Sequence, residues 1–274
     1  MSTPERVTAS APPTLAEICA VACAEAWRGD GEILASPIGP LPSLAARLAR
    51  ATFAPDLLLT DGIARLVTAT GAIEGWMPYR RVFDVVWSGR RHVMMGASQI
   101  DRFGNQNIAQ IVGTGDANKP ERQLVGVRGA PGNTICHPTS YWVPNHSVRT
   151  FVPRVDTVCG IGYDRAAALG AHAARFHEIR RVVTNLGVFD FETPDHAMRL
   201  RSIHPGVTES EIVKSTGFPL TIPANVTATR APTDEELRLI REVLDPKGEA
   251  RAADFARRDE RAPRPTSTPA ERTR

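Results

Sequence analysis

Short apolar runs alternate along this chain with segments of helical periodicity, and this alternation restricts the possible folds more than any other feature. The apolar runs predict strands at 32–36, 56–60, 92–96, 155–160 and 180–184, and the periodic segments predict helices at 14–27, 44–53, 80–87 and 233–244. Strands that alternate with helices indicate an open, mostly parallel α/β sheet with helices on both faces. The strand-rich segment 107–203 can add an antiparallel portion to it.

Three Thr-x-x-Glu patterns mark helix starts, at Thr14, Thr208 and Thr233. In a capping box the threonine hydroxyl accepts a hydrogen bond from the backbone N–H three residues on, and the glutamate there bonds back to the cap. The first pattern opens the helix that runs to about Trp27. The third opens a helix to about residue 244, where Pro246 ends it.

Charge is divided unevenly between a neutral body and a basic tail. Residues 247–274 contain eight Lys or Arg and five Asp or Glu, which accounts for the whole net charge of +3. A neutral body argues against a nucleic-acid-binding protein, which needs a basic face on its folded part. Composition therefore predicts a disordered segment 1–13, one α/β domain over 14–246, and a disordered basic tail over 247–274 that is dispensable for activity.

The cysteines and the hydropathy indicate an intracellular protein. Four cysteines in 274 residues are too few for a disulfide framework. Cys19 and Cys23 have a spacing that two metal ligands on a helix could use, but no CxxC or HxxxH pattern accompanies them, and small core residues are the favoured interpretation. Neither a signal-peptide core nor a membrane-spanning run is evident. We expect a cytoplasmic protein with no metal site and no membrane partner.

A polar turn at 96–107 follows the predicted strand at 92–96. Its glycines at 96 and 104 permit close backbone approach, and its amide and carboxylate side chains are Gln99, Asp101, Asn105 and Asn107. Reactive loops of open α/β sheets follow the carboxyl ends of the strands, so these side chains are candidates for substrate binding. A hydrogen-bonded structural turn explains the same composition and is the alternative.

A glycine-rich loop at 127–134 leads into Cys136 and His137. Such loops present backbone N–H groups to an oxyanion or phosphate, especially where a helix follows. The loop lacks the Lys-Ser/Thr of a P-loop, and Gly160-Ile161-Gly162 lacks the third glycine of a dinucleotide fingerprint, so nucleotide hydrolysis and NAD binding are disfavoured. A Cys–His dyad is also disfavoured, because adjacent side chains seldom face each other and no orienting acid is evident. His137 is better explained as a residue that lines a pocket.

These loops, in this order, resemble those of the β subunits of family I (3-oxoacid) coenzyme A transferases. The Gly-Ala-x-Gln-x-Asp-x-x-Gly-Asn-x-Asn segment at 96–107 and the glycine-rich stretch 129–133 carry the resemblance. The chain is still more similar to the β subunits of the actinobacterial cholesterol ring-cleaving CoA hydrolases, a family related to those transferases. The matching stretches are 56–62, 73–78, 90–107, 126–142, 155–163, 182–191 and 237–246. The resemblance implies the CoA-transferase (NagB/RpiA) type of α/β fold.

The resemblance gives the Thr60-Asp61-Gly62 turn a meaning that its composition alone does not. Family I transferases carry at this place a Glu-Asn-Gly signature, whose glutamate forms covalent acyl and CoA-thioester intermediates. In that register Thr60 replaces the nucleophile, and a threonine hydroxyl without a base beside it is a poor substitute for a carboxylate. Asp61 would point to the opposite face of the strand. Covalent CoA transfer is therefore disfavoured.

The resemblance implies the β subunit of a hydrolase that opens the last steroid-derived ring of a cyclohexenone carboxyl-CoA thioester. The reaction would be a water-dependent C–C cleavage in cholesterol and steroid C/D-ring catabolism. It further implies a cytoplasmic α2β2 heterotetramer with the catalytic glutamate on the α subunit, and coenzyme A as part of the substrate rather than as a bound cofactor. This chain would supply hydrogen-bond donors and substrate walls. The candidate substrate- and CoA-binding residues are Gln99, Asp101, Asn105, Gly129, Ala130, Gly132, Asn133, His137, Tyr141 and Trp142.

Two other functions stay open. A genuine family I CoA-transferase β subunit would need a carboxylate other than the one that Thr60 replaces, with Asp61 and Glu74 as candidates that the sequence does not decide between. A non-catalytic scaffold subunit would use the glycine loops only to shape a subunit interface.

Overall fold

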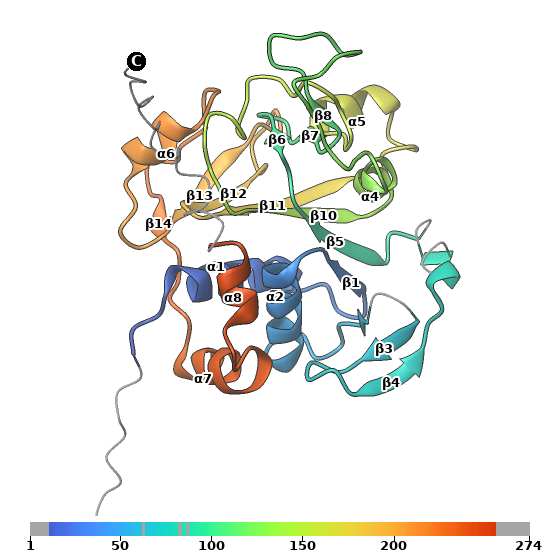
Figure 1. Cartoon of the computed structure of the whole chain (residues 1–274), viewed down its shortest axis with the longest axis vertical. Coiled ribbons are helices and arrows are strands. Elements are labelled where there is room, and N and C mark those ends of the chain that lie inside the picture. The colour runs from blue at the N-terminus through green and yellow to red at the C-terminus, as the bar shows by residue number, and fades with distance from the viewer. Residues whose placement is uncertain (1–10, 62–63, 82–83, 86–87, 256–274) are drawn as a thin grey trace, which may run out of the picture.

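The computed structural model describes residues 11–61, 64–81, 84–85 and 88–255, and its centre is a seven-stranded sheet in the order β1-β5-β10-β11-β12-β13-β14 (Figure 1). The strands are β1 Leu34–Pro37, β5 Arg91–Met95, β10 Pro138–Val143, β11 Glu178–Thr184, β12 Gly187–Asp190, β13 Arg199–Ile203 and β14 Thr227–Ala228. Four of the pairings are parallel, whereas β11–β12 and β12–β13 are antiparallel. The predicted mostly parallel sheet with an antiparallel portion is confirmed.

Side chains of the central strands alternate between two apolar cores, one on each face of the sheet. Met94, Trp142 and Val183 belong to the first core, and their neighbours Val93, Tyr141 and Val182 belong to the second. This period of two follows from the pleat, which directs successive side chains to opposite faces. Strands buried on both faces have nearly continuous apolar sequences, which is why these runs are recognisable in the chain.

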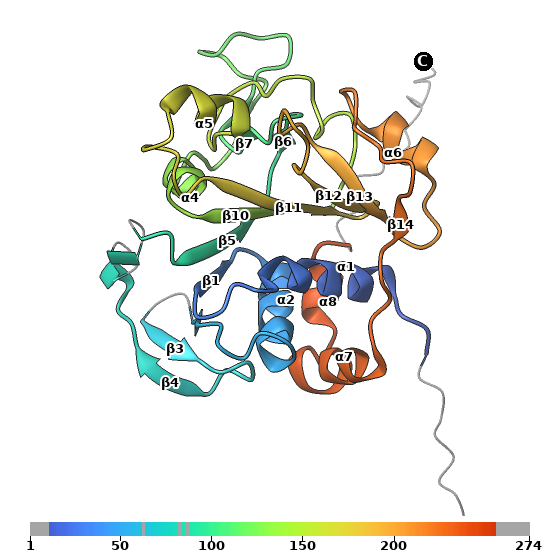
Figure 2. The same cartoon turned by 180° about the vertical axis from the view of Figure 1, so that it is seen from behind.

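Helices from both ends of the chain cover the first face, which we call the α1 face (Figures 1 and 2). They are α1 Leu15–Ala24, η1 Glu25–Trp27, α2 Pro40–Ala51, α7 Asp234–Arg238, the π-helical segment η3 Leu239–Leu244, and α8 Glu249–Ala253. Of the three predicted capping boxes, those at Thr14 and Thr233 are complete. Thr208 caps α6 (Glu209–Ser215) by accepting from the Glu211 N–H, without the return bond from the Glu211 side chain that a capping box needs. The helix predicted at 44–53 begins earlier, at Pro40, because a proline at the first helical position lacks only an N–H that would be unpaired there.

The opposite face, the α4 face, is covered by short helices, loops and two small hairpins (Figure 2). The helices are α4 Ala130–Cys136, α5 Tyr163–Leu169 and α6, whose Ile212 belongs to the core of this face. The hairpin strands are β6 Gln99–Ile100, β7 Gln106–Asn107, β8 Gln110–Ile111 and β9 Arg122–Gln123. A separate three-stranded sheet of β2 Leu59–Thr60, β3 Arg65–Val67 and β4 Ile73–Trp76 lies beyond β1, and η2 Tyr79–Arg81 follows it.

Three sequence-based expectations need correction or fall partly outside the described residues. Residues 155–160 do not form a strand: apart from a single bridge between Gly160 and Gln106, this segment is irregular and leads into α5. Residues 82–83 and 86–87 of the helix predicted at 80–87 lie outside the described residues. The tail predicted as disordered from 247 onward is ordered as far as Phe255, and residues 256–274 lie outside the described residues.

The ordered part of the tail packs on the α1 face through ion pairs with buried acids. The fully buried carboxylate of Glu17 in α1 accepts hydrogen bonds from Arg241 of η3 and Arg251 of α8, each at 2.8 Å. Burial by itself would raise the pKa of Glu17, but the bonds from Arg241 and from Thr14 outweigh it and hold the pKa at about 2. Composition alone could not predict this order, because it depends on partners more than 200 residues away in the sequence.

Candidate functional site

Thr60 and Ser36 lie at the same level of neighbouring strands, at the edge of the main sheet. A parallel bridge joins Leu34 to Leu58, and the Ala35 N–H donates to the Leu58 carbonyl at 3.0 Å. Ala35 and Leu59 belong to the core on the α1 face. Ser36 follows Ala35 and Thr60 follows Leu59, and successive side chains of a strand point to opposite faces. Ser36 and Thr60 therefore both lie on the α4 face, each two residues beyond the bridge.

Arg91 connects this edge to α4. Its Nη2 donates to Ser36 Oγ at 2.8 Å and its Nη1 donates to Asn133 Oδ1 at 2.9 Å, so one guanidinium joins β1, β5 and α4. A guanidinium that donates to two fixed acceptors is held in one orientation. We call Ser36, Thr60, Arg91 and Asn133 the Arg91 cluster. Ser36 and Arg91 were not among the candidates from the sequence, because nothing local in the chain indicates that β1, β5 and α4 meet.

The glycine-rich loop lies directly before α4 and is open to solvent. Gly129, Pro131 and Gly132 are exposed, whereas Ala130 and Asn133 are buried beneath them. A methyl group added at Gly132 would meet no atom within 4 Å. Packing therefore does not require glycine at 132, and the loop leaves its backbone accessible to a partner or a substrate.

His137 and Tyr141 are buried on the α4 face, near the Arg91 cluster and the polar turn respectively. Burial lowers the pKa of His137 to about 4, and the nearby positive charge of Arg91 adds to the shift, so the imidazole is neutral at pH 7. Burial also raises the pKa of Tyr141, with Asp101 and Cys159 contributing. Neither the His137 nitrogens nor the Tyr141 hydroxyl has a hydrogen-bond partner among the described residues. Both side chains fit the prediction of polar groups beside the loop.

Trp142 does not lie with them, which corrects the expected grouping of His137, Tyr141 and Trp142. It follows Tyr141 on β10, so its side chain lies on the opposite, α1 face, in the core with Phe255. There its Nε1 donates to Asp254 Oδ2 at 2.8 Å. The tryptophan anchors the ordered part of the tail and does not lie on the α4 face with His137 and Tyr141.

The polar turn at 96–107 is held together by its own side chains. The Asp101 carboxylate accepts from the Phe103 and Asn105 N–H groups, both at 3.0 Å, and Asn105 Oδ1 accepts from the Gly162 N–H at 2.8 Å. Gln99 Oε1 accepts from Asn107 Nδ2 at 2.7 Å. All of these side chains are buried, and burial raises the pKa of Asp101. This geometry favours the structural turn, and direct substrate contact by Gln99, Asp101 and Asn105 stays a prediction.

Gly104 carries the close backbone approach expected of this turn, and Gly96 does not. Gly104 has φ of +85°, and a Cβ there would clash with Ile179 Cδ1 and lie 3.0 Å from Phe191 Cζ. At Gly96 the nearest atom to such a Cβ is 3.8 Å away, an ordinary contact distance. The glycine at 104 is therefore required by both its backbone conformation and its packing.

Asp61 and Glu74, the two other carboxylates considered for covalent transfer, both form hydrogen bonds or ion pairs within this chain. Asp61 Oδ1 accepts from the Ala64 and Arg65 N–H groups at 2.9 and 3.0 Å, while Glu74 pairs with Arg50 at 2.6 Å. Gly62, the third member of the Thr60-Asp61-Gly62 motif, lies outside the described residues. Within the described ranges no three His, Cys, Asp or Glu side chains gather as a metal site would require, and no helix there is long and apolar enough to cross a membrane.

No protein-family model matches the chain. The sequence is 57% identical over 240 residues to the cholesterol ring-cleaving hydrolase IpdB subunit of Rhodococcus jostii (strain RHA1), which covers 85% of this chain and 93% of that protein. It is 31% identical over 228 residues to a subunit of the 3-oxoadipate CoA-transferase of Pseudomonas knackmussii, covering 73% and 82% respectively. The structure is similar to the crystal structure of R. jostii RHA1 IpdAB, with a TM-score of 0.82 at 55% identity over 87% of this chain and 97% of that chain. The chain therefore belongs to the family of cholesterol ring-cleaving hydrolase IpdB subunits, whose more distant relatives are subunits of CoA-transferases.

Proposed function

We propose that the chain is the β subunit of a hydrolase that opens the last steroid-derived ring of a cyclohexenone carboxyl-CoA thioester. The observation that carries this proposal is the 57% identity, over 85% of the chain, to a subunit named as a cholesterol ring-cleaving hydrolase. Membership of the CoA-transferase superfamily supports a CoA thioester as substrate, with coenzyme A entering as part of that substrate.

In the proposed reaction a water oxygen bonds to the carbon of a ring ketone, and the bond from that carbon to its ring neighbour breaks. The electron pair passes into an enolate stabilised by the thioester carbonyl, which is then protonated, and the former ketone carbon becomes a carboxylate. Such a reaction needs a base for the water and positive groups for the two developing oxyanions. We assign the base to a glutamate of the α subunit, as the family resemblance implies.

The Arg91 cluster and the glycine-rich loop are the parts of this chain suited to the oxyanions. Arg91 contributes a fixed positive charge on the α4 face, and Asn133 ties that charge to the start of α4. The exposed backbone at Gly129 and Gly132 can supply N–H donors to an oxygen of the substrate. His137 beside Arg91 is neutral at pH 7, so of these two side chains Arg91 alone carries the positive charge.

A covalent CoA transfer is less well supported, because the edge strand ends in a threonine. Thr60 stands where the transferases carry their glutamate, and the adjacent Asp61 carboxylate is occupied by two backbone N–H groups of its own turn. Glu74 of β4 is paired with Arg50. None of these groups offers the nucleophilic carboxylate that a transferase needs.

An α partner is supported by the subunit naming of the relatives and by the IpdAB structure. Large apolar side chains are exposed on segments that flank the Arg91 cluster: Ile38 after β1, Ile73 and Trp76 on β4, and Val125 and Val127 before the glycine loop. Exposed apolar residues of this size are typical of subunit interfaces. We place the α subunit over this edge and propose an α2β2 assembly.

The test is turnover of a ring-oxo acyl-CoA by the purified complex of this chain with its α subunit in H₂¹⁸O. We expect one ¹⁸O atom in the new carboxylate and no acyl-CoA formed from an added second carboxylic acid. Transfer of CoA to that acid, or an enzyme-bound CoA ester on this chain that hydroxylamine traps, would establish the transferase instead. Full turnover by a complex in which Arg91 is replaced by Gln would remove this chain from the chemistry and favour a scaffold role.

A further inference from the structure

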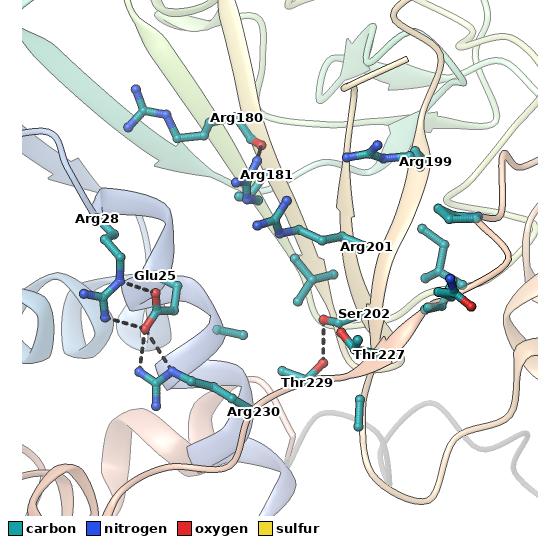
Figure 3. Close-up of a pocket in the computed structure, with 17 residues that line it drawn as sticks. Glu25, Arg28, Arg180, Arg181, Arg199, Arg201, Ser202, Thr227, Thr229 and Arg230 are labelled. Atoms are coloured by element: carbon teal, nitrogen blue, oxygen red, sulfur yellow. Dashed lines mark hydrogen bonds and ion pairs between the residues drawn. The ribbon is translucent and has the colours of Figure 1, made fainter.

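A groove of about 610 Å³ on the α1 face is lined by six arginines: Arg28, Arg180, Arg181, Arg199, Arg201 and Arg230 (Figure 3). Pockets for small ligands usually have volumes of roughly 300–1,000 Å³. The groove lies between η1 and strands β11–β14, on the other face of the sheet from the Arg91 cluster. It therefore needs an explanation separate from the ring-opening site.

Two β-bulges concentrate these side chains on one face. In the register of β10 with β11, Thr139 faces Ile179 and Ser140 faces Arg181, so Arg180 is an extra residue. In the register of β12 with β13, Val188 faces Ser202 and Phe189 faces Leu200, so Arg201 is extra.

An extra residue interrupts the alternation and allows two consecutive side chains to point to the same side. Arg180 and Arg181 line the groove together, and so do Arg201 and Ser202. Bulges commonly occur beside functional sites, where they re-aim a side chain.

Three of the four arginines on the sheet wall share two carboxylates, whereas the fourth, Arg180, pairs with Asp30 and Glu178. Arg181, Arg199 and Arg201 share Asp190 and Glu192. Asp190 is fully buried and accepts two bonds from Arg199, both at 2.8 Å, so it is a fixed partner. Glu192 is 56% exposed and pairs with Arg199 at 2.8 Å, whereas it lies 3.3 Å from Arg181 and 3.6 Å from Arg201, exposed contacts of small energetic value. An incoming anion could replace Glu192 at these two guanidinium groups.

The like charges on this wall are also close enough to affect each other. Burial lowers the pKa of Arg181, and the positive charge of Arg201 lowers it further. Figure 3 shows both guanidinium groups directed into the groove from neighbouring parts of the sheet. Bringing a multiply charged anion between them would relieve this repulsion.

The remaining walls supply hydroxyl groups and little competing negative charge. Ser202 Oγ and Thr229 Oγ1 lie 2.8 Å apart, and Thr229 Oγ1 also lies 2.9 Å from His204 Nδ1, so these hydroxyl groups bond to each other and to His204 (Figure 3). Among the described residues that line it, Glu25 is the single carboxylate, and it is held by Arg28 and Arg230 at 2.6 and 2.5 Å. Guanidinium groups bind phosphate oxygens strongly, because their planar N–H donors match two oxygens at once.

We propose that this groove is a binding site for a phosphate-bearing small molecule, in which Arg181 and Arg201 bind the phosphate oxygens and the anion displaces Glu192. The phosphate can come from the nucleotide end of a coenzyme A molecule or from free pyrophosphate, since both present several negative charges. The site is distinct from the ring-opening site and does not depend on that activity.

Isothermal titration of the α/β complex with inorganic pyrophosphate, CoA and 3′-dephospho-CoA at fixed ionic strength tests the proposal. We expect Arg201→Gln to weaken binding of the preferred anion at least tenfold, and Glu192→Gln to tighten it at least threefold because the competing carboxylate is gone. Arg238→Gln and Glu235→Gln change the same charges in an exposed pair on α7 and should leave the affinity unchanged.

The two sources of phosphate give different outcomes within the same experiment. If CoA is the ligand, the tenfold loss in Arg201→Gln is seen with CoA, and removing its 3′-phosphate weakens binding to the native groove. If a free phosphate anion is the ligand, pyrophosphate itself shows the loss in Arg201→Gln and the gain in Glu192→Gln. The proposal is wrong if no probe is affected by Arg201→Gln, or if Glu192→Gln binds no better than its Glu235→Gln control.

Discussion

The buried Glu17 provides the sharpest quantitative test of the structure. Its carboxylate has no exposed surface and accepts from Arg241 at 2.8 and 2.9 Å, from Arg251 at 2.8 Å and from the Thr14 N–H at 2.8 Å. These bonds join α1 to η3 and α8. Glu17→Gln preserves the size of the side chain and removes the charge, so it isolates the ionic part of the interaction.

The magnitude follows from the depressed pKa. The pKa of Glu17 falls from the ordinary 4.5 to about 2, which corresponds to roughly 3 kcal/mol of folding free energy at 25 °C. A carboxylate whose pKa is lower in the folded state stabilises the protein above the unfolded pKa, and this contribution is lost as the pH falls from 4.5 towards 2. Between pH 7 and pH 3 about 2 kcal/mol of it should disappear.

Urea unfolding followed by tryptophan fluorescence at pH 7, 5, 4 and 3 measures this effect, since Trp27 is buried in the same core. The difference in unfolding free energy between the native protein and Glu17→Gln should shrink by about 2 kcal/mol from pH 7 to pH 3. Glu242→Gln removes an exposed carboxylate 4.0 Å from Arg238 and serves as the control whose difference stays flat. A Glu17→Gln difference that stays constant within about 0.5 kcal/mol would refute the reasoning.

Four further predictions concern the tail, the site and the polar turn. Ending the chain after Pro246 deletes α8 and the Asp254 carboxylate that accepts from Trp142, and should lower the Tm by about 5 °C; ending it after Phe255 should not, and equal Tm values for the two truncations would contradict the packing. Arg91→Gln should lower kcat/KM for ring opening about 100-fold in the folded complex, with Arg91→Lys retaining part of the activity, and a loss below tenfold would remove Arg91 from oxyanion binding. Thr60→Ala should keep kcat within about threefold, because a threonine without a base is not a nucleophile, and a larger loss in steady-state assays would assign it a direct role. Asn105→Ala should lower the Tm by about 4 °C, since it leaves the Gly162 N–H without its acceptor; lost turnover at an unchanged Tm would instead indicate substrate contact.

The sequence by itself determined the elements whose signals are local. The capping boxes at Thr14 and Thr233 depend on residues only a few positions apart, as do the apolar strands predicted at 32–36, 92–96 and 180–184, and the structure has all of these where the patterns predict. The resemblance carried by the segments 96–107 and 129–133 was sufficient for the family, because long specific motifs identify relatives without any knowledge of packing.

Tertiary structure alone decided which groups share a face. The cluster of Ser36, Arg91 and Asn133 needs three elements to meet. The arginine groove depends on two bulges, at Arg180 and Arg201, which are features of register between strands and leave no mark within either strand. The order of the tail likewise rests on the pairing of Arg251 with Glu17, which lies at the other end of the chain. Contacts between distant segments are set by how the whole sheet is assembled, so local patterns predict the elements of this protein but not the sites that they build together.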